Sequence, residues 1–239
     1  MTFEATKITK SYKERMILNG VDVSFNQGEI VGILGPNGAG KTTLFSILTG
    51  IASPDTGQIS IDGRDVMKLR VYQRAKEGVV YLPQDSSIFR GLNVEDNIRA
   101  VLQLSLKSKD EIGEHLERLL DVFSIGHLRR ANAPVLSGGE RRKVEIARTL
   151  AAFPKFLMLD EPFSGIDPIS VSEIVEIIKN LKSTGIGIIV TDHNVRETLR
   201  TLDRGYIIAN GRILTKGTAD DILQNDITRR IYLGNEFKI

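Results

Sequence analysis

The sequence of 239 residues contains no cysteine and no long apolar run. The lack of cysteine excludes disulfides, thiolate-bound zinc, iron–sulfur ligation and thiol catalysis. No run approaches the length of about 18 apolar residues that a membrane-spanning helix needs, and residues 1–16 lack the apolar segment of a signal peptide. We therefore expect a cytoplasmic protein that has no transmembrane segment and reaches a membrane only through a partner or a surface.

Charge of neither sign predominates in the sequence. The 32 lysines and arginines face 30 acidic residues, which gives a formal net charge of +2. This balance gives no support for a nucleic-acid partner, because such partners select a strongly basic face. Hydrophobic residues make up 41% of the chain and charged residues 26%. These fractions are those of an ordinary globular protein, so collagen-like and disordered classes are excluded.

The spacing of apolar residues predicts a single α/β domain over residues 1–239. Apolar and polar residues alternate over 3–8 and 21–25, residues 58–63 have a hairpin pattern, and residues 94–123 have helical spacing. After residue 155, strands ending at residues 159 and 191 alternate with helices at about 170–183 and 194–202. This order predicts a mostly parallel sheet with helices on both faces, an antiparallel region near the start, and a helical subdomain over about 86–150.

Residues 35–43 match the phosphate-binding pattern G-x-x-x-x-G-K-[ST] at every fixed position. A strand-like segment precedes this phosphate loop and a helix-like segment follows it, as the pattern requires. Glycines let main-chain N–H groups turn toward phosphate oxygens, and the helix N-terminus adds positive potential. Lys41 would contact the β and γ phosphates, and the Thr42 hydroxyl would bind Mg²⁺. The nucleotide-binding candidates are Gly35, Pro36, Asn37, Gly38, Ala39, Gly40, Lys41, Thr42 and Thr43.

Two carboxylates, Asp160 and Glu161, follow an apolar strand at residues 156–159. Ligands of open α/β sheets bind at the carboxyl ends of strands, where the chain leaves the sheet and both side chains can reach one crevice. Asp160 suits the coordination sphere of Mg²⁺. Glu161 suits the polarisation of an attacking water.

A turn made of Ser137, Gly138 and Gly139 precedes a helix-like segment. Ser137 followed three residues later by Glu140 forms a capping-box pattern. Exposed glycines at a helix N-terminus also make a site for an anion. The Ser-Gly-Gly turn (residues 137–139) is therefore either a plain helix start or a phosphate contact.

These motifs together resemble the ATP-binding cassette (ABC) family. The resemblance is carried, in the family's order, by residues 35–43, Gln84, residues 136–140, residues 157–161, residues 164–167 and His193, and it covers essentially the whole chain. It implies an ABC ATPase fold with a RecA-like P-loop core, an antiparallel β subdomain and a helical subdomain. It also implies ATP as the nucleotide and a homodimer, because family members pair head to tail and close each ATP site with the Ser-Gly-Gly turn of the other copy.

The resemblance assigns further roles to individual residues. Tyr12 matches the aromatic residue that stacks on adenine, and Gln84 matches the ligand of Mg²⁺ and water that also senses a membrane partner. Asp167 matches a residue at the dimer interface. His193 matches the histidine that holds the γ-phosphate and the water. The other two histidines, His115 and His127, are expected at the surface.

Within the family, the closer resemblance is to the ATPases that power lipopolysaccharide export, on residues 87–90, 136–148, 191–198 and 230–237. It implies two integral membrane subunits that dock in a groove beside Phe89 and Arg90, and a location on the cytoplasmic face of the inner membrane. Residues 230–237 match a tail used for dimer contacts, although packing onto its own core explains such a tail equally well. Gly91 departs from the pattern, since a second arginine is common there.

Two alternatives remain open from the sequence. One is the ATPase of a branched-chain amino-acid importer, which shares the cassette but not the pattern of residues 193–198 or the tail. The other is an ABC ATPase without a transporter that serves iron–sulfur assembly or DNA repair. The segment between Gln84 and Ser137 is too short for the coiled coil of the DNA-repair branch, and the charge does not favour DNA.

Overall fold

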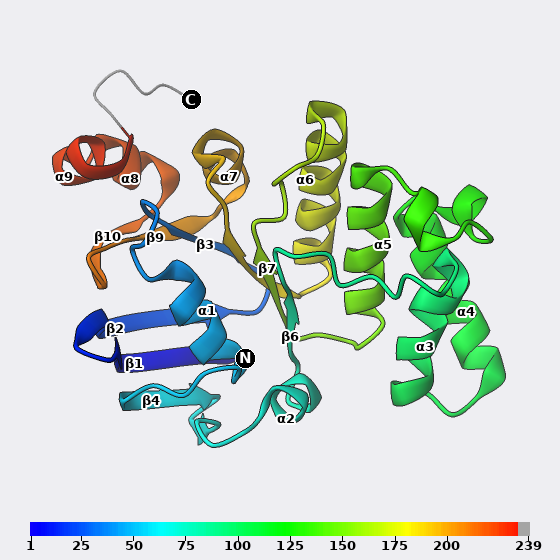
Figure 1. The fold of residues 1–239 in the computed structure, drawn as a ribbon, viewed down its shortest axis with the longest axis horizontal. Helices are drawn as coiled ribbons and strands as arrows, with labels where there is room; N and C mark the ends of the chain where they lie inside the picture. Colours follow the sequence, from blue (N-terminus) through cyan, green and yellow to red (C-terminus); the bar gives the residue numbers. More distant parts are fainter. Residues whose placement is uncertain (234–239) are drawn as a thin grey trace.

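Two sheets organise the chain in the computed structural model, which describes residues 1–233 (Figure 1). The smaller sheet is antiparallel with the order β2-β1-β4-β5. The larger sheet has the order β10-β9-β3-β8-β7-β6, and all its pairs are parallel except β10 with β9. The strands are β1 (Thr2–Tyr12), β2 (Arg15–Asn26), β3 (Ile30–Leu34), β4 (Thr56–Ile61), β5 (Arg64–Asp65), β6 (Val79–Leu82), β7 (Phe156–Asp160), β8 (Gly187–Thr191), β9 (Arg204–Ala209) and β10 (Arg212–Gly217).

The helices of the described residues are α1 (Lys41–Thr49), α2 (Val71–Lys76), α3 (Val94–Ser105), α4 (Lys109–Val122), α5 (Gly138–Leu150), α6 (Pro168–Ser183), α7 (Val195–Thr201), α8 (Ala219–Gln224) and α9 (Asp226–Thr228). They include those predicted from the sequence, and α2, α8 and α9 in addition. Short helical turns lie at Gly126–Leu128, Ala133–Val135 and Arg229–Leu233. None of the helices in the described residues is long and apolar enough to cross a membrane.

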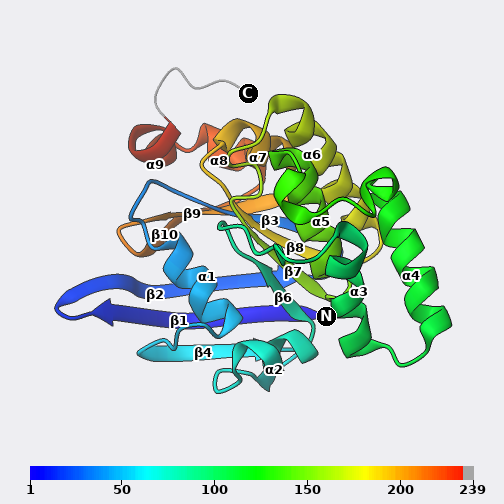
Figure 2. The same ribbon diagram turned by 45° about the vertical axis from the view of Figure 1, so that its right-hand side comes forward.

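The segment with helical spacing at 94–123 forms two helices, α3 and α4. Leu106 ends α3 in an extended conformation, and the Ser108 side chain caps α4 by accepting from the Glu111 N–H. Serine favours a cap over a helix interior because its oxygen satisfies a main-chain donor. Figures 1 and 2 show α3, α4 and α5 gathered beside the larger sheet, away from the antiparallel strands.

The hairpin pattern predicted at residues 58–63 forms the turn between β4 and β5. Asp62 and Gly63 both have positive φ, at 47° and 77°. Two successive residues of this kind are what a tight hairpin turn with the right-handed twist needs, and Asp-Gly is the sequence that tolerates it.

Strands β3, β7 and β8 are buried along their whole length. This is typical of a parallel sheet covered on both faces. On one face, Leu157 and Leu159 pack into a core with helices α3 to α6. On the other face, Phe156 and Met158 pack with α1 and the antiparallel sheet. Helix α1, which follows the phosphate loop, and helices α3 to α6 therefore lie on opposite sides of β7.

A buried arginine completes the end of helix α1. Arg74 is 1% exposed, and its guanidinium donates to Ile47 O at 2.5 Å and Leu48 O at 2.6 Å, and to two carbonyls before α2. Burial lowers the pKa of Arg74 to about 10. The carbonyls of a last helical turn lack intrahelical partners, so this cation satisfies them and also complements the negative end of the helix dipole.

Candidate nucleotide-binding and catalytic site

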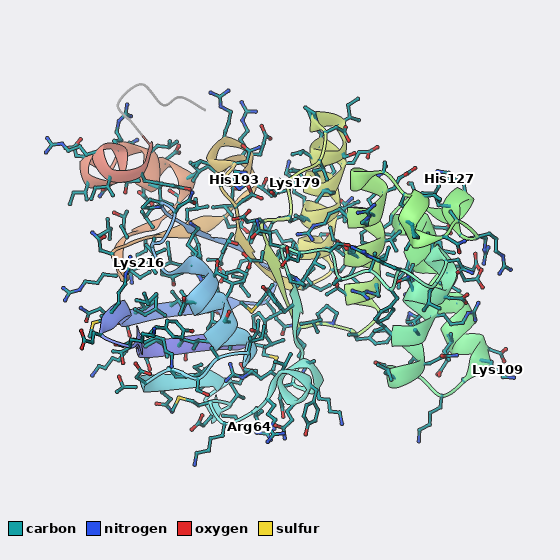
Figure 3. All side chains as sticks on the ribbon, viewed as in Figure 1. Arg64, Lys109, His127, Lys179, His193 and Lys216 are labelled. Atoms are coloured by element: carbon teal, nitrogen blue, oxygen red, sulfur yellow. The ribbon has the colours of Figure 1, made fainter. Side chains whose placement is uncertain are left out.

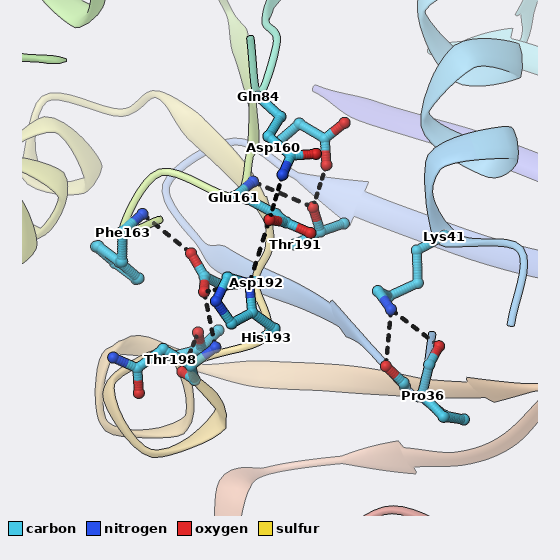
Figure 4. A network of polar contacts seen from close by, with 12 residues as sticks. Pro36, Lys41, Gln84, Asp160, Glu161, Phe163, Thr191, Asp192, His193 and Thr198 are labelled. Carbon is cyan, nitrogen blue, oxygen red and sulfur yellow. Dashed lines mark hydrogen bonds and ion pairs between the residues drawn. The ribbon is translucent and has the colours of Figure 1, made fainter. Parts of the chain in front are cut away.

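Four strands of the larger sheet deliver polar residues to the same edge. The phosphate loop follows β3, Gln84 follows β6, Asp160 ends β7, and His193 comes shortly after β8. Because these strands are parallel neighbours, their carboxyl ends meet. The side chains predicted from separate parts of the sequence are thereby gathered in one place (Figure 4).

The phosphate loop begins at a glycine that no other residue can replace without displacement. Gly35 has a φ of 154°, and a Cβ built on it would lie 2.0 Å from the Ile208 main-chain oxygen. The loop therefore packs directly against β9. It borders a pocket of about 270 Å³ that is lined by Arg15, Ile17, Asn37, Gly38, Ala39, Gly40, Lys41, Thr42, Thr43 and Glu161.

Lys41 points into the phosphate loop. Its ammonium donates to Gly35 O at 2.7 Å and to Pro36 O at 3.0 Å. Burial lowers the pKa of Lys41, while the carboxylates Glu161 and Asp160 act in the opposite direction. A half-buried cation held between neutral carbonyls is placed to exchange these partners for the oxygens of an anion.

Asp160 is fixed by hydroxyl groups from both neighbouring strands. It is 4% exposed. Its Oδ1 accepts from the Thr191 hydroxyl at 2.5 Å, and its Oδ2 accepts from the Tyr81 hydroxyl at 3.0 Å. Burial and the nearby Asp160 charge raise the pKa of Tyr81. Tyr81 therefore stays protonated and remains a donor, which holds the carboxylate in one orientation.

Glu161 lies at the centre of the polar network in Figure 4. Its Oε2 accepts from the Gln84 side-chain amide at 2.7 Å and lies 3.2 Å from Nδ1 of His193. The main chain of Glu161 has a φ of 47°, which is uncommon for a residue with a side chain. Its N–H donates to Thr191 O at 2.8 Å and helps to hold this conformation. The structure thus brings Gln84, Glu161 and His193 together, as the sequence predicts.

The loop that carries His193 is anchored by a buried carboxylate. Asp192 is 0% exposed and accepts from the Phe163 N–H at 3.0 Å and the Asn194 N–H at 2.7 Å. It therefore ties the segment after Glu161 to the start of α7. This residue was not among those predicted from the sequence, although an acid directly after a mostly apolar strand is a usable signal.

The Ser-Gly-Gly turn has the predicted capping box. Glu140 N–H donates to the Ser137 hydroxyl oxygen at 3.3 Å, and Ser137 N–H donates back to the Glu140 carboxylate at 2.8 Å. A Cβ on Gly139 would lie 2.0 Å from Ser170 Oγ at the start of α6. The turn packs against α6, and its residues are not among those that line the phosphate-loop pocket of the same chain. Figures 1 and 2 show β7 between α1 and α5.

Asp167 acts as the N-cap of helix α6. Its Oδ1 accepts from the N–H groups of Ile169 and Ser170, at 3.1 and 3.0 Å. Hydrogen bonds from Ser170 lower the pKa of Asp167. This capping role is sufficient to place an aspartate here, and the interface role remains a prediction.

Tyr12 lies at the end of β1 and is 50% exposed. The Lys10 ammonium lies 5.4 Å from the centre of its ring. The phosphate-loop pocket is lined instead by Arg15 and Ile17 from the start of β2. Tyr12 pairs with Arg15 across this hairpin, so the predicted aromatic lies next to the residues that reach the pocket. Its stacking on adenine remains a prediction.

Phe89 and Arg90 lie at the surface a few residues after Gln84. Phe89 is 46% exposed, and the Arg148 guanidinium lies 4.5 Å from the centre of its ring. Arg90 borders a cavity of about 260 Å³ together with Ser86, Ile88, Ala133, Pro134 and Arg141. These features supply an aromatic contact and a cation at one surface, which is what a docking groove needs.

The remaining histidines lie outside this network. His127 is exposed at the outer end of the helical part (Figure 3). His115 is half-buried and packs edge-on against Phe153, with ring centres 5.0 Å apart. The surface location predicted for His127 therefore agrees with the structure, while His115 is partly covered by Phe153.

Helix α5 contributes a buried arginine that the sequence analysis did not single out. Arg142 is 6% exposed and donates to the main-chain oxygens of Pro83, Asp160 and Glu161, at 3.1, 3.0 and 3.3 Å. It therefore joins the strand that leads to Gln84 with the strand that carries both acids. Charged residues repeat every third position at Arg142, Glu145 and Arg148 on a buried helix face, and this pattern is the signal that could have revealed them.

Comparisons with known proteins match these motifs. Residues 18–164 match a family model described as ABC transporter. The lipopolysaccharide export system ATP-binding protein LptB of Escherichia coli (strain K12) is 49% identical over 239 residues, which cover 100% of this chain and 99% of LptB. An uncharacterized ABC transporter ATP-binding protein of Rhizobium meliloti (strain 1021) is 54% identical over 238 residues, covering 100% of this chain and 88% of that protein.

Solved structures agree with the sequence comparison. The ADP conformation of MJ1267, an ATP-binding cassette of an ABC transporter, has a TM-score of 0.87 and 27% identity, over 98% of this chain and 100% of that one. The ADP- and Pi-bound dimer of the cassette MJ0796 has a TM-score of 0.81 and 23% identity, over 91% and 98% of the two chains, and supports the fold alone. The predicted fold class is confirmed. The chain belongs to the ABC transporter family, as an ATP-hydrolysing, nucleotide-binding subunit.

Proposed function

We propose that this chain is the ATPase subunit of a transporter that exports lipopolysaccharide from the inner membrane. The observation that carries this proposal is the 49% identity to LptB along all 239 residues. Motifs for ATP chemistry are shared throughout a family, so they identify the reaction and not the cargo. Identity that extends along the whole chain supports a shared partner as well. The amino-acid importer and iron–sulfur alternatives are not favoured by these relatives.

Glu161 is our candidate for the residue that orients the attacking water. It lines the phosphate-loop pocket, and one carboxylate oxygen is held by Gln84 and His193. Phosphoryl transfer depends mainly on positioning and on charge neutralisation at the transferred group. Lys41 would exchange its carbonyl partners for β- and γ-phosphate oxygens, while His193 would hold the γ-phosphate.

Mg²⁺ fits the oxygen donors at this site. The described residues contain no cluster of three or more His, Cys, Asp or Glu side chains placed to hold a metal. Mg²⁺ in nucleotide sites needs no such cluster, because phosphates and waters supply most of its ligands. We expect the Thr42 hydroxyl, the Gln84 amide oxygen and the Asp160 carboxylate to hold the ion. When bound, it neutralises negative charge on the phosphates.

We propose that two copies pair to form two composite ATP sites. Support comes from the placement of the Ser-Gly-Gly turn, which packs against α6 and is not among the residues lining the phosphate-loop pocket of its own chain. A second copy would supply this turn, and with it the N-terminus of α5, to the γ-phosphate. Asp167 would then lie near the contact between the copies.

Mixing two inactive variants tests the composite sites. Lys41→Ala disables the phosphate loop, and Gly138→Asp disables the Ser-Gly-Gly turn. If sites are shared, a mixed dimer contains one site with both intact halves, so an equal mixture should recover about a quarter of the unchanged ATPase activity. If each chain completes its own site, the mixture stays as inactive as its components. Unchanged thermal melting of each variant excludes unfolding as the cause.

Purification from solubilised inner membranes tests the transport role. We expect two integral membrane subunits to co-purify with the chain. Phe89→Ala and Arg90→Ala should reduce their recovery while ATP binding is retained, and Glu114→Ala on the exposed face of α4 is the control. Depletion of the chain in its own bacterium should leave newly made lipopolysaccharide in the inner membrane. Recovery of only soluble iron–sulfur assembly factors would overturn the proposal.

A further inference from the structure

One carboxylate in helix α5 connects the catalytic acids to the surface around Phe89. Glu145 is 2% exposed, so an ionised group at this position needs close partners. Its Oε2 lies 3.3 Å from Nη1 of Arg142. Its Oε1 accepts from the Ser86 hydroxyl at 2.7 Å and from the Ser87 N–H at 3.0 Å. Each oxygen of Glu145 thus faces a different part of the molecule.

The inner side of this connection ends at the backbone of the acid pair. Arg142 donates through Nη2 to the carbonyl oxygens of Asp160 and Glu161, and through Nη1 to Pro83 O and Glu145. Glu161 has a φ of 47°, a conformation that persists only where surrounding contacts hold it. The position of the Arg142 guanidinium therefore influences where the Glu161 carboxylate points.

The outer side ends at an exposed aromatic ring. Arg148 donates to the Ser87 hydroxyl at 2.5 Å, and its guanidinium lies 4.5 Å from the centre of the Phe89 ring. Asn97 holds the Phe89 main chain, since its carboxamide accepts from the Phe89 N–H at 2.8 Å and donates to the Phe89 carbonyl at 3.1 Å. A displacement of residues 86–89 therefore acts on Glu145 through two hydrogen bonds.

We propose that Glu145 is a positioning residue that links the segment 86–89 to the backbone of Glu161, so that a change at the exposed surface alters ATP turnover. This inference rests on the proposed role of Glu161. It assigns the link to side chains of helix α5, in addition to the chain connection through Gln84. Glu145 itself does not touch the phosphate-loop pocket, so it acts on the rate only through Arg142 and Glu161.

A double-mutant cycle tests the link in the purified full-length chain. Glu145→Gln weakens the contact with Arg142, and Ser86→Ala removes one contact on the exposed side. We expect each change to lower kcat about tenfold, because small misplacements of a catalytic group have effects of this size or larger. The Kd for ATP should stay within about twofold. The double variant should be no slower than the slower single variant, because both changes break one connection.

The cycle has controls that separate positioning from stability. Glu176→Gln and Ser172→Ala change exposed residues of α6 and should leave kcat and thermal melting unchanged. Ser86 is exposed, so its variant keeps the test usable if Glu145→Gln does not fold. Amide hydrogen exchange at Ser87 should accelerate in Glu145→Gln, because the neutral amide oxygen is a weaker acceptor for that N–H than a carboxylate oxygen.

Several outcomes would overturn the inference. Multiplicative effects of the two changes would show that they act independently. An unchanged kcat in either variant would mean that Glu145 only supports the fold. A joint fall in ATP affinity, kcat and melting temperature would mean the same. A wrong role for Glu161 can be distinguished from a wrong link through Glu145, because Glu161→Gln would retain ATP turnover in the first case. If Glu161→Gln is inactive while the Glu145 and Ser86 variants turn over normally, only the link is wrong.

Discussion

The Gln84 side-chain amide donates to Glu161 Oε2 over 2.7 Å, although 77 residues separate them in the sequence. His193 approaches the same oxygen at 3.2 Å. The carboxylate that we assign to water orientation is therefore held from two strands at once. The direction of the Glu161 carboxylate therefore depends on Gln84 and His193 as well as on its own backbone.

Glu161→Gln should abolish most ATP turnover while ATP binding is retained. The amide has nearly the same shape but no negative charge to orient and polarise water, and loss of such a group costs about 10³-fold in rate. Gln84→Ala removes only one of the two partners, so its kcat should fall less, by about tenfold. Phosphate release and nucleotide binding, measured separately, check both. A loss of only about twofold for Glu161→Gln would contradict its role.

Gly35→Ala should disrupt the phosphate loop itself. The new Cβ would lie 2.0 Å from the Ile208 carbonyl oxygen, and φ is 154°. The β9 main chain cannot move aside cheaply, so we expect loss of ATP affinity by at least about tenfold. Gly20→Ala is the matched control, since Gly20 also has positive φ, at 70°, but nothing lies within 4 Å of its Cβ position. Equal ATP binding by both variants would show that the loop adapts.

Arg74→Met should destabilise the fold by about 3 kcal/mol. The apolar side chain fills the space, but the carbonyls of Leu48, Met67 and Leu69 lose the donor that Arg74 provides. Buried acceptors without partners cost about 1–3 kcal/mol each. Urea unfolding followed by circular dichroism measures the change. Lys68→Met, on the exposed surface beside α2, should leave the midpoint unchanged. A similar shift in both variants would refute the capping role.

Glu95, in helix α3, should make the free energy of unfolding sensitive to acid. Hydrogen bonds from Arg99, and from Arg129 at 3.0 Å, lower its pKa from the ordinary value of 4.5. Because the folded-state pKa is the lower one, the contribution of Glu95 to the free energy of unfolding is complete above pH 4.5 and is lost as the pH falls through the folded-state value. Glu95→Gln should therefore differ most from the unchanged chain near pH 7.

Unfolding curves across pH check this prediction. The difference in unfolding free energy between Glu95→Gln and the unchanged chain should shrink as the pH falls below 4.5. Glu114→Gln, on the exposed side of α4, should follow the unchanged chain at every pH. A difference that stays constant with pH would mean that Glu95 contributes by packing rather than by charge.

The sequence predicts the parts of the site that local patterns encode. The loop at 35–43 lies in consecutive residues, and the apolar strands before it and before Asp160 have a composition typical of a covered parallel sheet. The contacts of Arg142 could not be predicted in the same way. They join α5 to strands β6 and β7, and helical periodicity says which residues face inward but not which carbonyls they meet. The left-handed backbone of Glu161 also has no signal in the residue type.

The hairpin near the phosphate loop shows a similar limit. Arg15 and Ile17 line the pocket but are not predicted from the sequence, while the stacking of Tyr12 on adenine remains a prediction. The register shifts between β1 and β2, including one between Lys10 and Ser11, change which side chains face the loop. Such irregularities cannot be predicted from the alternation of residue types.

The order of strands also has a consequence for biosynthesis. Strand β3 leads into the phosphate loop at residue 35, yet its neighbours are β8 (Gly187–Thr191) and β9 (Arg204–Ala209). Translation must therefore pass residue 187 before this strand gains either neighbour. A nascent chain shorter than this therefore lacks both sheet neighbours of the strand that leads into its phosphate loop.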